Sequence, residues 1–389
     1  MSIPLDANGS TALLPEVLDA MLPWLRDSHA NPSGAYAAGR AAREAIEAAR
    51  HEVAEWIGAQ ADELIFTSGG TESAHLALHS MHRLVGQGSA VVSAIEHAAV
   101  LRCAEELDRP LQLAPVDGLG RLDLEAFERL LPGAAMVSVM AANNETGVLQ
   151  PVREAARMAA ERGLPFHSDA VQVAGKGELD VRQLGVDLLS LSAHKFHGPK
   201  GVGALYVRRG LRFHSLFRGG AQELGRRAGT ENVAGIVGMA AAARAARQRS
   251  DGPRRLRQLR DSFEGKLLAE LPGVQLNGDP QQRLPNTSHL SFEGCEAVEL
   301  IALLDEAGLE CSAASACLSG RIRPSHVQLA MGLGGARGRS SLRFSFSILN
   351  SEAQAWQAAE LVKTCVARLR AGGRASQSGS CACSFDPSA

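Results

Sequence analysis

Short apolar runs alternate with amphipathic stretches along the first two thirds of the chain. The apolar runs predict β-strands over 63–68, 90–95, 135–140, 165–168, 187–192 and 202–207. Several are apolar throughout, as expected for strands buried on both faces of a mostly parallel sheet. The stretches between them have helical spacing, and two helices over 15–26 and 37–57 precede the first strand. This alternation predicts an α/β fold, with a large domain over 16–250 whose mostly parallel sheet is flanked by helices.

The chain after residue 250 is organised differently. An Arg-rich stretch over 244–260 is interrupted by Ser-Asp-Gly-Pro at 250–253, which predicts two helices with a break between them. We expect a smaller α+β domain over 251–370 that ends in a helix over 351–369. Residues 1–15 are predicted to be an N-terminal segment that packs with this small domain. Residues 371–389 are rich in Gly and Ser and predict a flexible, Cys-containing tail.

Composition narrows the class of protein. The formal net charge is -2 and aromatic residues make up 4% of the chain, which argues against nucleic acid as a partner. No apolar run approaches the ~20 residues that span a bilayer, and the first residues lack the pattern of an export signal. Seven cysteines, an odd number, fit a reducing compartment better than a disulfide framework. We therefore expect a cytoplasmic protein with no membrane partner.

Polar groups follow five of the predicted strands. They lie at Gly69–Ser73, Glu96–His97, Asn143–Gly147, Asp169–Gln172 and Ala193–Lys195. Ligands of α/β sheets bind at the carboxyl ends of the strands, where these groups would meet. One such group alone would be an ordinary helix cap or turn. Five together predict a ligand site at this edge of the sheet.

Pyridoxal 5′-phosphate (PLP) is a ligand that needs this set of side chains. Its aldehyde forms a Schiff base with a lysine, and Lys195 is one of only five lysines among 40 basic residues. Its ring nitrogen needs a carboxylate, for which Asp169 is the candidate. His97 could stack on the ring, and Gln172 could bind the phenolic oxygen. Thr71 and the backbone amides beside it could hold the phosphate.

The sequence also resembles a known family, the cysteine desulfurases. These belong to the class V branch of the aminotransferase-like, fold type I PLP enzymes. The run SAHKFHGPKG at 192–201 is quite specific, and its spacing from HSDAVQ at 167–172 adds to that specificity. The resemblance extends over residues 3–365. It rests on these further motifs: LDANGST, NPSGAYAAGRAAR, FTSGGTES, EH at 96–97, NNETGVLQP, GVGAL, RAGTEN, SAC at 315–317 and SSLRFSF.

The resemblance implies roles for individual residues. The implied PLP-binding residues are Gly70, Thr71, His97, Asn144, Asp169, Gln172, Ser192, His194, Lys195 and Thr230. Lys195 would bond the cofactor covalently, and Ser192 and His194 would help to hold its phosphate. In the family a threonine at the position of Thr230 reaches the phosphate of the other subunit, which implies a homodimer. Asn144 and Arg343 would bind the substrate carboxylate.

The implied activity is the conversion of L-cysteine to L-alanine, with Lys195, His97 and Cys317 as catalytic residues. Cys317 lies among small residues at 314–320 and would be the nucleophile that receives the sulfur as a persulfide. Its distance along the chain from Arg343 resembles the longer-loop group, whose cysteine moves between substrate and acceptor. The acceptor would be a protein of iron–sulfur cluster assembly or of thiocofactor or tRNA thiolation.

Other interpretations remain open from the sequence. A selenocysteine lyase or a cysteine sulfinate desulfinase would use the same PLP-binding residues, whereas a plain aminotransferase would not need Cys317. A non-catalytic sulfur-assembly subunit is a different class, and the intact Lys195, Asp169, His97 and Cys317 argue against it. The segment LDANGST departs from the usual family pattern, because Ala7 and Gly9 replace residues with larger side chains.

Two groups of residues remain outside this interpretation. One predicted helix face carries a carboxylate and three imidazoles, at Glu72, His75, His79 and His82. An ordinary helix face is the simpler explanation, and we predict no metal. Cys381 and Cys383 are too few for a zinc site within the chain. Our hypothesis is that they relay sulfur from Cys317 by thiol exchange or protect the persulfide on Cys317.

Overall fold

A seven-stranded sheet forms the centre of the larger part of the molecule. The computed structural model describes residues 2–313 and 324–378, and the strand order is β2-β8-β7-β6-β5-β3-β4. β8 is antiparallel to β2 and β7, and the other neighbouring strands are parallel. The bounds are β2 Leu64–Thr67, β3 Ser89–Ser93, β4 Leu111–Ala114, β5 Ala134–Ser138, β6 Phe166–Asp169, β7 Leu188–Ser192 and β8 Gly203–Val207. The predicted α/β fold with a mostly parallel sheet is confirmed.

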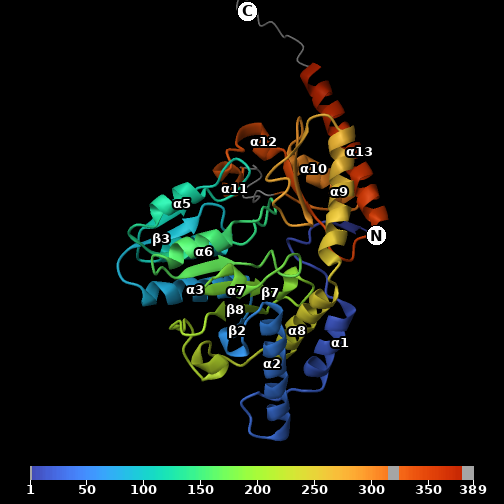
Figure 1. Cartoon of the computed structure of the whole chain (residues 1–389). Helices are drawn as coiled ribbons and strands as arrows, with labels where there is room; N and C mark the ends of the chain where they lie inside the picture. The colour runs from blue at the N-terminus through green and yellow to red at the C-terminus, as the bar shows by residue number, and fades with distance from the viewer. Residues whose placement is uncertain (1, 314–323, 379–389) are drawn as a thin grey trace, which may run out of the picture.

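Helices cover both faces of this sheet (Figure 1). Alternate residues of one strand belong to different cores, since Leu189 and Leu191 pack in one apolar cluster and Leu188 in the other. Both faces of β7 are therefore buried, which explains why the strand has leucines on each face. The helix bounds are α1 Pro15–Arg26, α2 Ala37–Trp56, α3 Gly70–Leu84, α4 Ala98–Glu106, α5 Leu124–Leu130, α6 Val152–Ala160, α7 Val181–Leu184 and α8 Val233–Gln248. α1, α2, α6 and α8 contribute to the first cluster, and α3 and α4 to the second.

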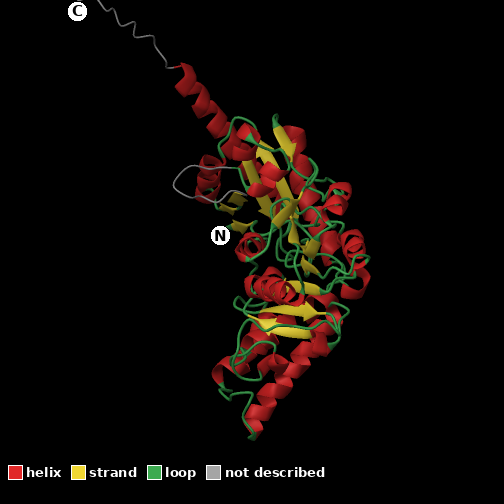
Figure 2. Cartoon of the chain, turned by 90° about the vertical axis from the view of Figure 1, so that its left-hand side faces the viewer, coloured by secondary structure: helices red, strands yellow, loops and turns green. Residues whose placement is uncertain are grey.

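The second part of the chain builds an antiparallel sheet of four strands in the order β12-β13-β10-β9 (Figure 2). The strands are β9 Val274–Leu276, β10 Thr287–Phe292, β12 Ser312–Ala313 and β13 Ser341–Ser345. The helices are α9 Gly252–Glu270, α10 Ala297–Glu306, α11 His326–Ala330, α12 Gly335–Arg339 and α13 Glu352–Ser378. β1 (Ile3–Pro4) pairs with β11 (Leu309–Glu310), so the first residues of the chain lie beside this sheet.

The structure differs from the sequence-based expectations in two elements. β4 was not predicted, because Leu111–Ala114 is a short, partly exposed edge strand with a weak apolar signal. α13 continues to Ser378, whereas we expected it to end at residue 369 before a flexible tail. Gly and Ser lower helix propensity without excluding a helix. A prediction from composition therefore placed the end of α13 too early. Cys381 and Cys383 lie outside the described residues.

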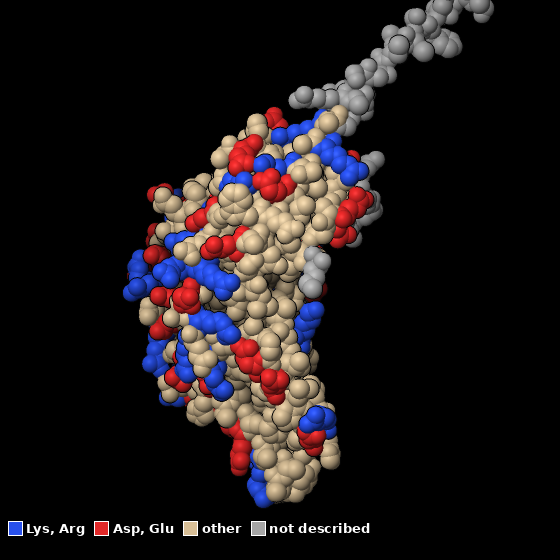
Figure 3. Space-filling model, turned by 90° about the vertical axis from the view of Figure 1, so that its right-hand side faces the viewer, with Lys and Arg blue, Asp and Glu red and all other residues tan. Residues whose placement is uncertain are grey.

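The surface and the helices add two findings. Acidic and basic side chains are interspersed over the face in Figure 3, in keeping with a net charge near zero. Within residues 2–313 and 324–378, each helix is either too short or too polar to cross a bilayer.

We predict that Phe263→Ala destabilises the protein by about 3–5 kcal/mol, because the variant leaves a cavity in the apolar core that packs against the four-stranded sheet. Phe263 is fully buried and its ring centroid lies 4.9 Å from that of Phe344 and 5.6 Å from that of Phe346. Leu268→Ala on the same helix is the control, since Leu268 is 41% exposed and should change stability by no more than about 0.5 kcal/mol. Urea unfolding measures both, and equal effects would contradict the assigned core.

Candidate active site

The carboxyl ends of five strands meet at one edge of the large sheet. β2, β3, β5, β6 and β7 run in the same direction, and each is followed by one of the predicted polar groups. A cavity of about 360 Å³ opens there. The predicted residues that line it are Gly70, Thr71, His97, Asn144, Asp169, Gln172, Ser192, His194, Lys195 and Arg343. The fold thus brings together residues that lie as much as 273 positions apart, between Gly70 and Arg343.

A buried polar ladder fixes the strand that carries Asp169. His167 lies in β6, where its Nδ1 is 2.8 Å from Ser138 Oγ and its Nε2 is 2.9 Å from Ser190 Oγ. Burial lowers the pKa of His167 to about 3, so the ring is neutral and bridges β5, β6 and β7. Asp169 is the last residue of β6, two positions further on. Its carboxylate is therefore positioned by side-chain bonds as well as by the strand hydrogen bonds.

Asp169 is a buried carboxylate with little compensation from the protein. It is 8% exposed, and its Oδ1 accepts a hydrogen bond of 2.9 Å from the Val171 amide. Burial raises the pKa of Asp169, and the cationic forms of His97 and Lys195 oppose this shift. A further cation next to Asp169 would stabilise its charged form. The protonated ring nitrogen of a pyridine is such a cation.

Glu96 and His97 form the loop after β3. His97 caps α4, because its Nδ1 accepts a 3.1 Å hydrogen bond from the Ala99 amide. Burial lowers the pKa of His97, which keeps its ring neutral with the proton on Nε2. Glu96 is completely buried, and burial together with nearby Asp169 raises its pKa well above the usual range. Burial thus displaces both carboxyl groups of this pair toward their neutral forms.

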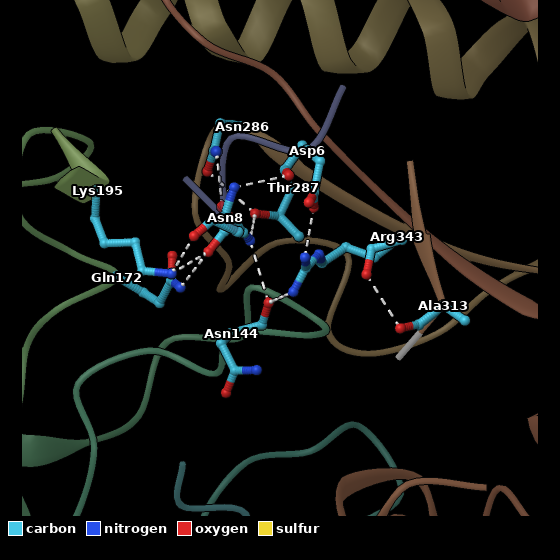
Figure 4. Close-up of polar contacts among 12 residues, drawn as sticks. Asp6, Asn8, Asn144, Gln172, Lys195, Asn286, Thr287, Ala313 and Arg343 are labelled. Atoms are coloured by element: carbon cyan, nitrogen blue, oxygen red, sulfur yellow. Dashed lines mark hydrogen bonds and ion pairs between the residues drawn. The ribbon is translucent and has the colours of Figure 1, made fainter. Parts of the chain in front are cut away.

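Lys195 follows β7 in a short turn of 3-10 helix and points toward the start of the chain (Figure 4). Its Nζ donates hydrogen bonds of 2.6 Å to the carbonyl of Asn8 and 2.7 Å to that of Gly9. Burial, assisted by the positive charge of Arg343, lowers the pKa of Lys195 to about 8. A substantial fraction of the amine is therefore neutral near physiological pH, which is the nucleophilic form.

Asn8 is a site residue to which the sequence analysis gave no role. Its carbonyl also accepts a 3.0 Å hydrogen bond from Gln172 Nε2. Its side-chain amide donates to Thr287 Oγ1 at 2.8 Å, and its Oδ1 accepts from Asn286 at 3.0 Å (Figure 4). The signal in the sequence was the polar stretch after Leu5, a residue that is fully buried. Periodicity could not show which strands this stretch would touch.

Arg343 lies on β13 between the two sheets. It donates to Asp6 Oδ1 at 2.6 Å and to the Asn144 carbonyl at 2.9 Å, as Figure 4 shows. Within the described residues its buried Nε has no hydrogen-bond partner. A Cβ at Gly9 would lie 2.3 Å from Asp6 Oδ2, so a side chain there would displace the Asp6 carboxylate. The missing side chain at position 9 is thus linked to the Asp6–Arg343 ion pair.

The opposite end of the cavity is formed by the first turn of α3. A Cβ at Gly70 would lie 2.8 Å from Val171 Cγ2, so the close packing of this turn requires glycine. Free amides at a helix N-terminus favour an anion, and the hydroxyls of Thr71 and Ser192 add donors. Burial, then the charge of Lys195, lowers the pKa of His194 to about 4. These residues could hold an anionic group such as a phosphate.

Among the described residues of the predicted set, Thr230 does not line this cavity. Thr230 is exposed and lines a separate cavity of about 130 Å³ with Glu223 and Arg227. Cys317 lies outside the described residues. The roles assigned to both therefore stay predictions.

Known proteins are similar to this chain in sequence and in fold. The sequence profile "Aminotransferase class-V" matches residues 3–356. A cysteine desulfurase of Cereibacter sphaeroides is 46% identical over 374 residues, which cover 94% of this chain and 96% of the relative. A solved NifS-like protein superposes with a TM-score of 0.88 at 33% identity, covering 95% of this chain and 100% of the other. "SspA in complex with cysteine" superposes with a TM-score of 0.78 at 32% identity, covering 89% and 99%.

The chain belongs to the class-V aminotransferase family. Within it the chain is a member of the cysteine desulfurases, as the motifs indicated. The cofactor of these enzymes is PLP. The residues present fit PLP. Lys195 has a lowered pKa, Asp169 is a buried carboxyl group whose pKa burial raises, His97 has a flat neutral ring, and the N-terminus of α3 favours an anion.

We predict that the reactivity of Lys195 in the cofactor-free protein rises with pH and levels off above about 8. Only the neutral amine reacts, so its rate with an acylating reagent at pH 7 should be about a tenth of the plateau. Lys363 is an internal control, because bonding to Glu270 raises its pKa and moves its midpoint upward. Peptide mass spectrometry measures the acylation of both lysines as a function of pH. If both had the same midpoint pH, the lowered pKa of Lys195 would be refuted.

Proposed function

We propose that this chain is a PLP-dependent enzyme that converts L-cysteine to L-alanine and retains the sulfur as a persulfide on Cys317. The observation that carries the proposal is the cavity in which Lys195, Asp169, His97 and Arg343 converge. The high identity to a named cysteine desulfurase and the similarity to SspA, which was solved with cysteine, support L-cysteine as the substrate.

The cofactor would be held along the length of the cavity. Lys195 would bond it covalently, Asp169 would pair with its ring nitrogen, and His97 would lie against its ring. Gln172 is next to Lys195 through their shared contact with the Asn8 carbonyl, so it can donate to the phenolic oxygen. The residues assigned to the phosphate are Gly70, Thr71, Ser192 and His194, which line the same cavity. When bound, PLP supplies an electron sink for bonds broken at the substrate.

Arg343 is the residue that would bind the substrate carboxylate. Its guanidinium is held by Asp6 and by the Asn144 carbonyl, and it lines the cavity on the side away from the phosphate end. A planar guanidinium binds a carboxylate through two parallel hydrogen bonds. The Asn144 side chain lines the cavity next to it, where it can add a donor.

Lys195 and His97 would move protons during the reaction. The lowered pKa of Lys195 lets the amine accept a proton at neutral pH and return it as an ammonium. His97 is neutral and fixed by its bond to Ala99, so its Nε2–H faces the cavity rather than the helix. Both groups line the cavity, so Lys195 can accept a proton released at the substrate while the His97 Nε2–H acts as a donor beside it.

The sulfur step would be performed by the Cys317 thiolate. It attacks the substrate sulfur, the carbon–sulfur bond breaks, and a sulfur–sulfur bond forms. The carbon is reduced to the methyl group of alanine and takes up a proton, and the sulfur is oxidised to the persulfide level. Burial raises the pKa of Cys103, Cys295, Cys311 and Cys365, which makes these described cysteines poor nucleophiles.

We infer a homodimer from the segment that contains Thr230. Leu224, 73% exposed, and the partly exposed Leu216 and Phe217 lie on the same segment, which would be covered by a second subunit. Glu223 and Leu224 have positive φ angles of 50° and 58°, so tertiary contacts must impose this loop conformation. In a dimer Thr230 would contact the phosphate bound by the other chain, as the family resemblance implies.

The sulfur would pass to an acceptor protein in the cytoplasm. A relative from Azotobacter vinelandii, "Cysteine desulfurase NifS", is 42% identical over 373 residues and supports an acceptor in iron–sulfur cluster assembly. The thiolation of a cofactor or of tRNA would use the same persulfide.

We predict that Lys195→Ala purifies without the visible absorbance of covalently bound PLP while remaining folded. The change removes the amine that would hold the aldehyde. Lys363→Ala is the control, since Lys363 lies on α13, is paired with Glu270 and is absent from the residues around the 360 Å³ cavity. Spectra after gel filtration compare the variants. Retained cofactor on a lysine of Lys195→Ala would overturn the assignment.

We predict that Cys317→Ser keeps bound PLP but releases alanine from L-cysteine at less than about a hundredth of the normal rate, because serine cannot accept the sulfur. Cys311→Ser should retain activity, since burial raises the pKa of Cys311 to about 12. Alanine is measured together with persulfide mass on peptides. Normal release of alanine by Cys317→Ser would rule out Cys317 as the nucleophile.

A further inference from the structure

A second group of side chains, outside the candidate active site, lies between α3 and α4. His75 and His79 lie one turn apart on α3, and Cys103 lies on the neighbouring α4. Their ligand atoms, two imidazole nitrogens and one sulfur, all lie within 4.8 Å of one another. Cys103 is fully buried and the two histidines are half-buried, so the group reaches from the apolar core to the surface.

The sequence had suggested a different set of partners for these histidines. Glu72 is not available, because its carboxylate pairs with Arg227 at 2.8 Å. His82 is also occupied, since its Nδ1 accepts a 2.9 Å hydrogen bond from Arg109 Nε. The tertiary structure instead supplies a thiol from a second helix. The change from an expected His/Glu face to a His/His/Cys group changes the chemistry toward softer metals.

The ligand atoms of this group lie almost as close together as the ligands of a bound metal ion do. With Zn–S near 2.3 Å and Zn–N near 2.0–2.1 Å, tetrahedral ligands lie roughly 3.3–3.6 Å apart. Each ligand atom would need to move by only about 1 Å or less, which rotation of the half-buried imidazoles allows. We propose that His75, His79 and Cys103 form a binding site for zinc or a similar thiophilic divalent cation that joins α3 to α4.

The surroundings of the group suit such a cation. Burial lowers the pKa of His79 and raises that of Cys103 to about 12, so without metal the imidazole is a neutral ligand and the thiol keeps its proton. Binding would replace that thiol proton with the cation. Glu106 is exposed one turn after Cys103, and its charge acts on both Cys103 and His79. Glu106 or a water molecule can complete four-fold coordination.

The position of the site connects it to the cavity. α3 starts at Gly70 and Thr71, where an anion could bind, and α4 starts at its cap, His97. A metal held between the two helices would fix their relative position one to two turns from those residues. We therefore expect the metal to stabilise the PLP-loaded enzyme without taking part in the reaction.

The test is a Zn²⁺ titration of the full-length, PLP-loaded enzyme after removal of metals with a chelator. Wild type is compared with His79→Gln, Cys103→Ser and the control His82→Gln. All cysteines other than Cys103 are present in each protein, so Zn²⁺ bound by them does not differ between the variants. We expect wild type and His82→Gln to bind one more Zn²⁺ per chain than the other two variants. If the variants bind as many Zn²⁺ ions as wild type, their affinity for Zn²⁺ should fall at least about tenfold. Even the loss of a residue that only hydrogen-bonds to a metal ligand costs that much affinity.

A second readout separates ligation from a change in folding. Zn²⁺ should raise the Tm of wild type and of His82→Gln and leave those of His79→Gln and Cys103→Ser unchanged. Co²⁺ in place of Zn²⁺ should give a sulfur-to-metal absorption band that Cys103→Ser loses. All variants should retain PLP absorbance, which shows that they are folded. Equal Zn²⁺ binding and equal Tm shifts in all four proteins would overturn the proposal.

Discussion

The contacts of Asn8 hold the candidate site together. Its carbonyl binds Lys195 and Gln172 at the edge of the large sheet, and its side chain binds Asn286 and Thr287 at the start of β10. One residue near the start of the chain thus connects both sheets at the position where the lysine must be placed. Because Asn8 is 1% exposed, each of these polar groups would be costly to leave unpaired, which makes the arrangement specific.

Burial determines the charges within the cavity. It lowers the pKa of Lys195 and His97 and raises that of Asp169 and Glu96, so each group is moved toward its neutral form. A pyridine ring with a protonated nitrogen would reverse this for Asp169 alone. A cation is therefore favoured beside Asp169, and an anion is favoured at the N-terminus of α3. The protonated ring and the phosphate of PLP would supply these two charges.

Much of the site could be predicted because it follows strand ends. Each apolar run is long enough to identify a buried strand, and the polar residues after it stand out against that background, as with Asp169 after β6 and Lys195 after β7. The short edge strand β4 and the end of α13 were missed, since neither has a strong periodic signal. The Asp6–Arg343 ion pair was also missed, because it joins residues 337 positions apart.

The sequence by itself determined the α/β class, the positions of the strands and the chemistry of the loops that follow them, because these depend on local periodicity and residue type. Only the tertiary structure decided which distant residues meet. It placed Asn8 against Lys195, set Asp6 on Arg343, and brought Cys103 to His75 rather than leaving the histidine with Glu72. Such pairings are fixed by the packing of whole helices and sheets, and periodicity within one segment carries no information about its neighbours.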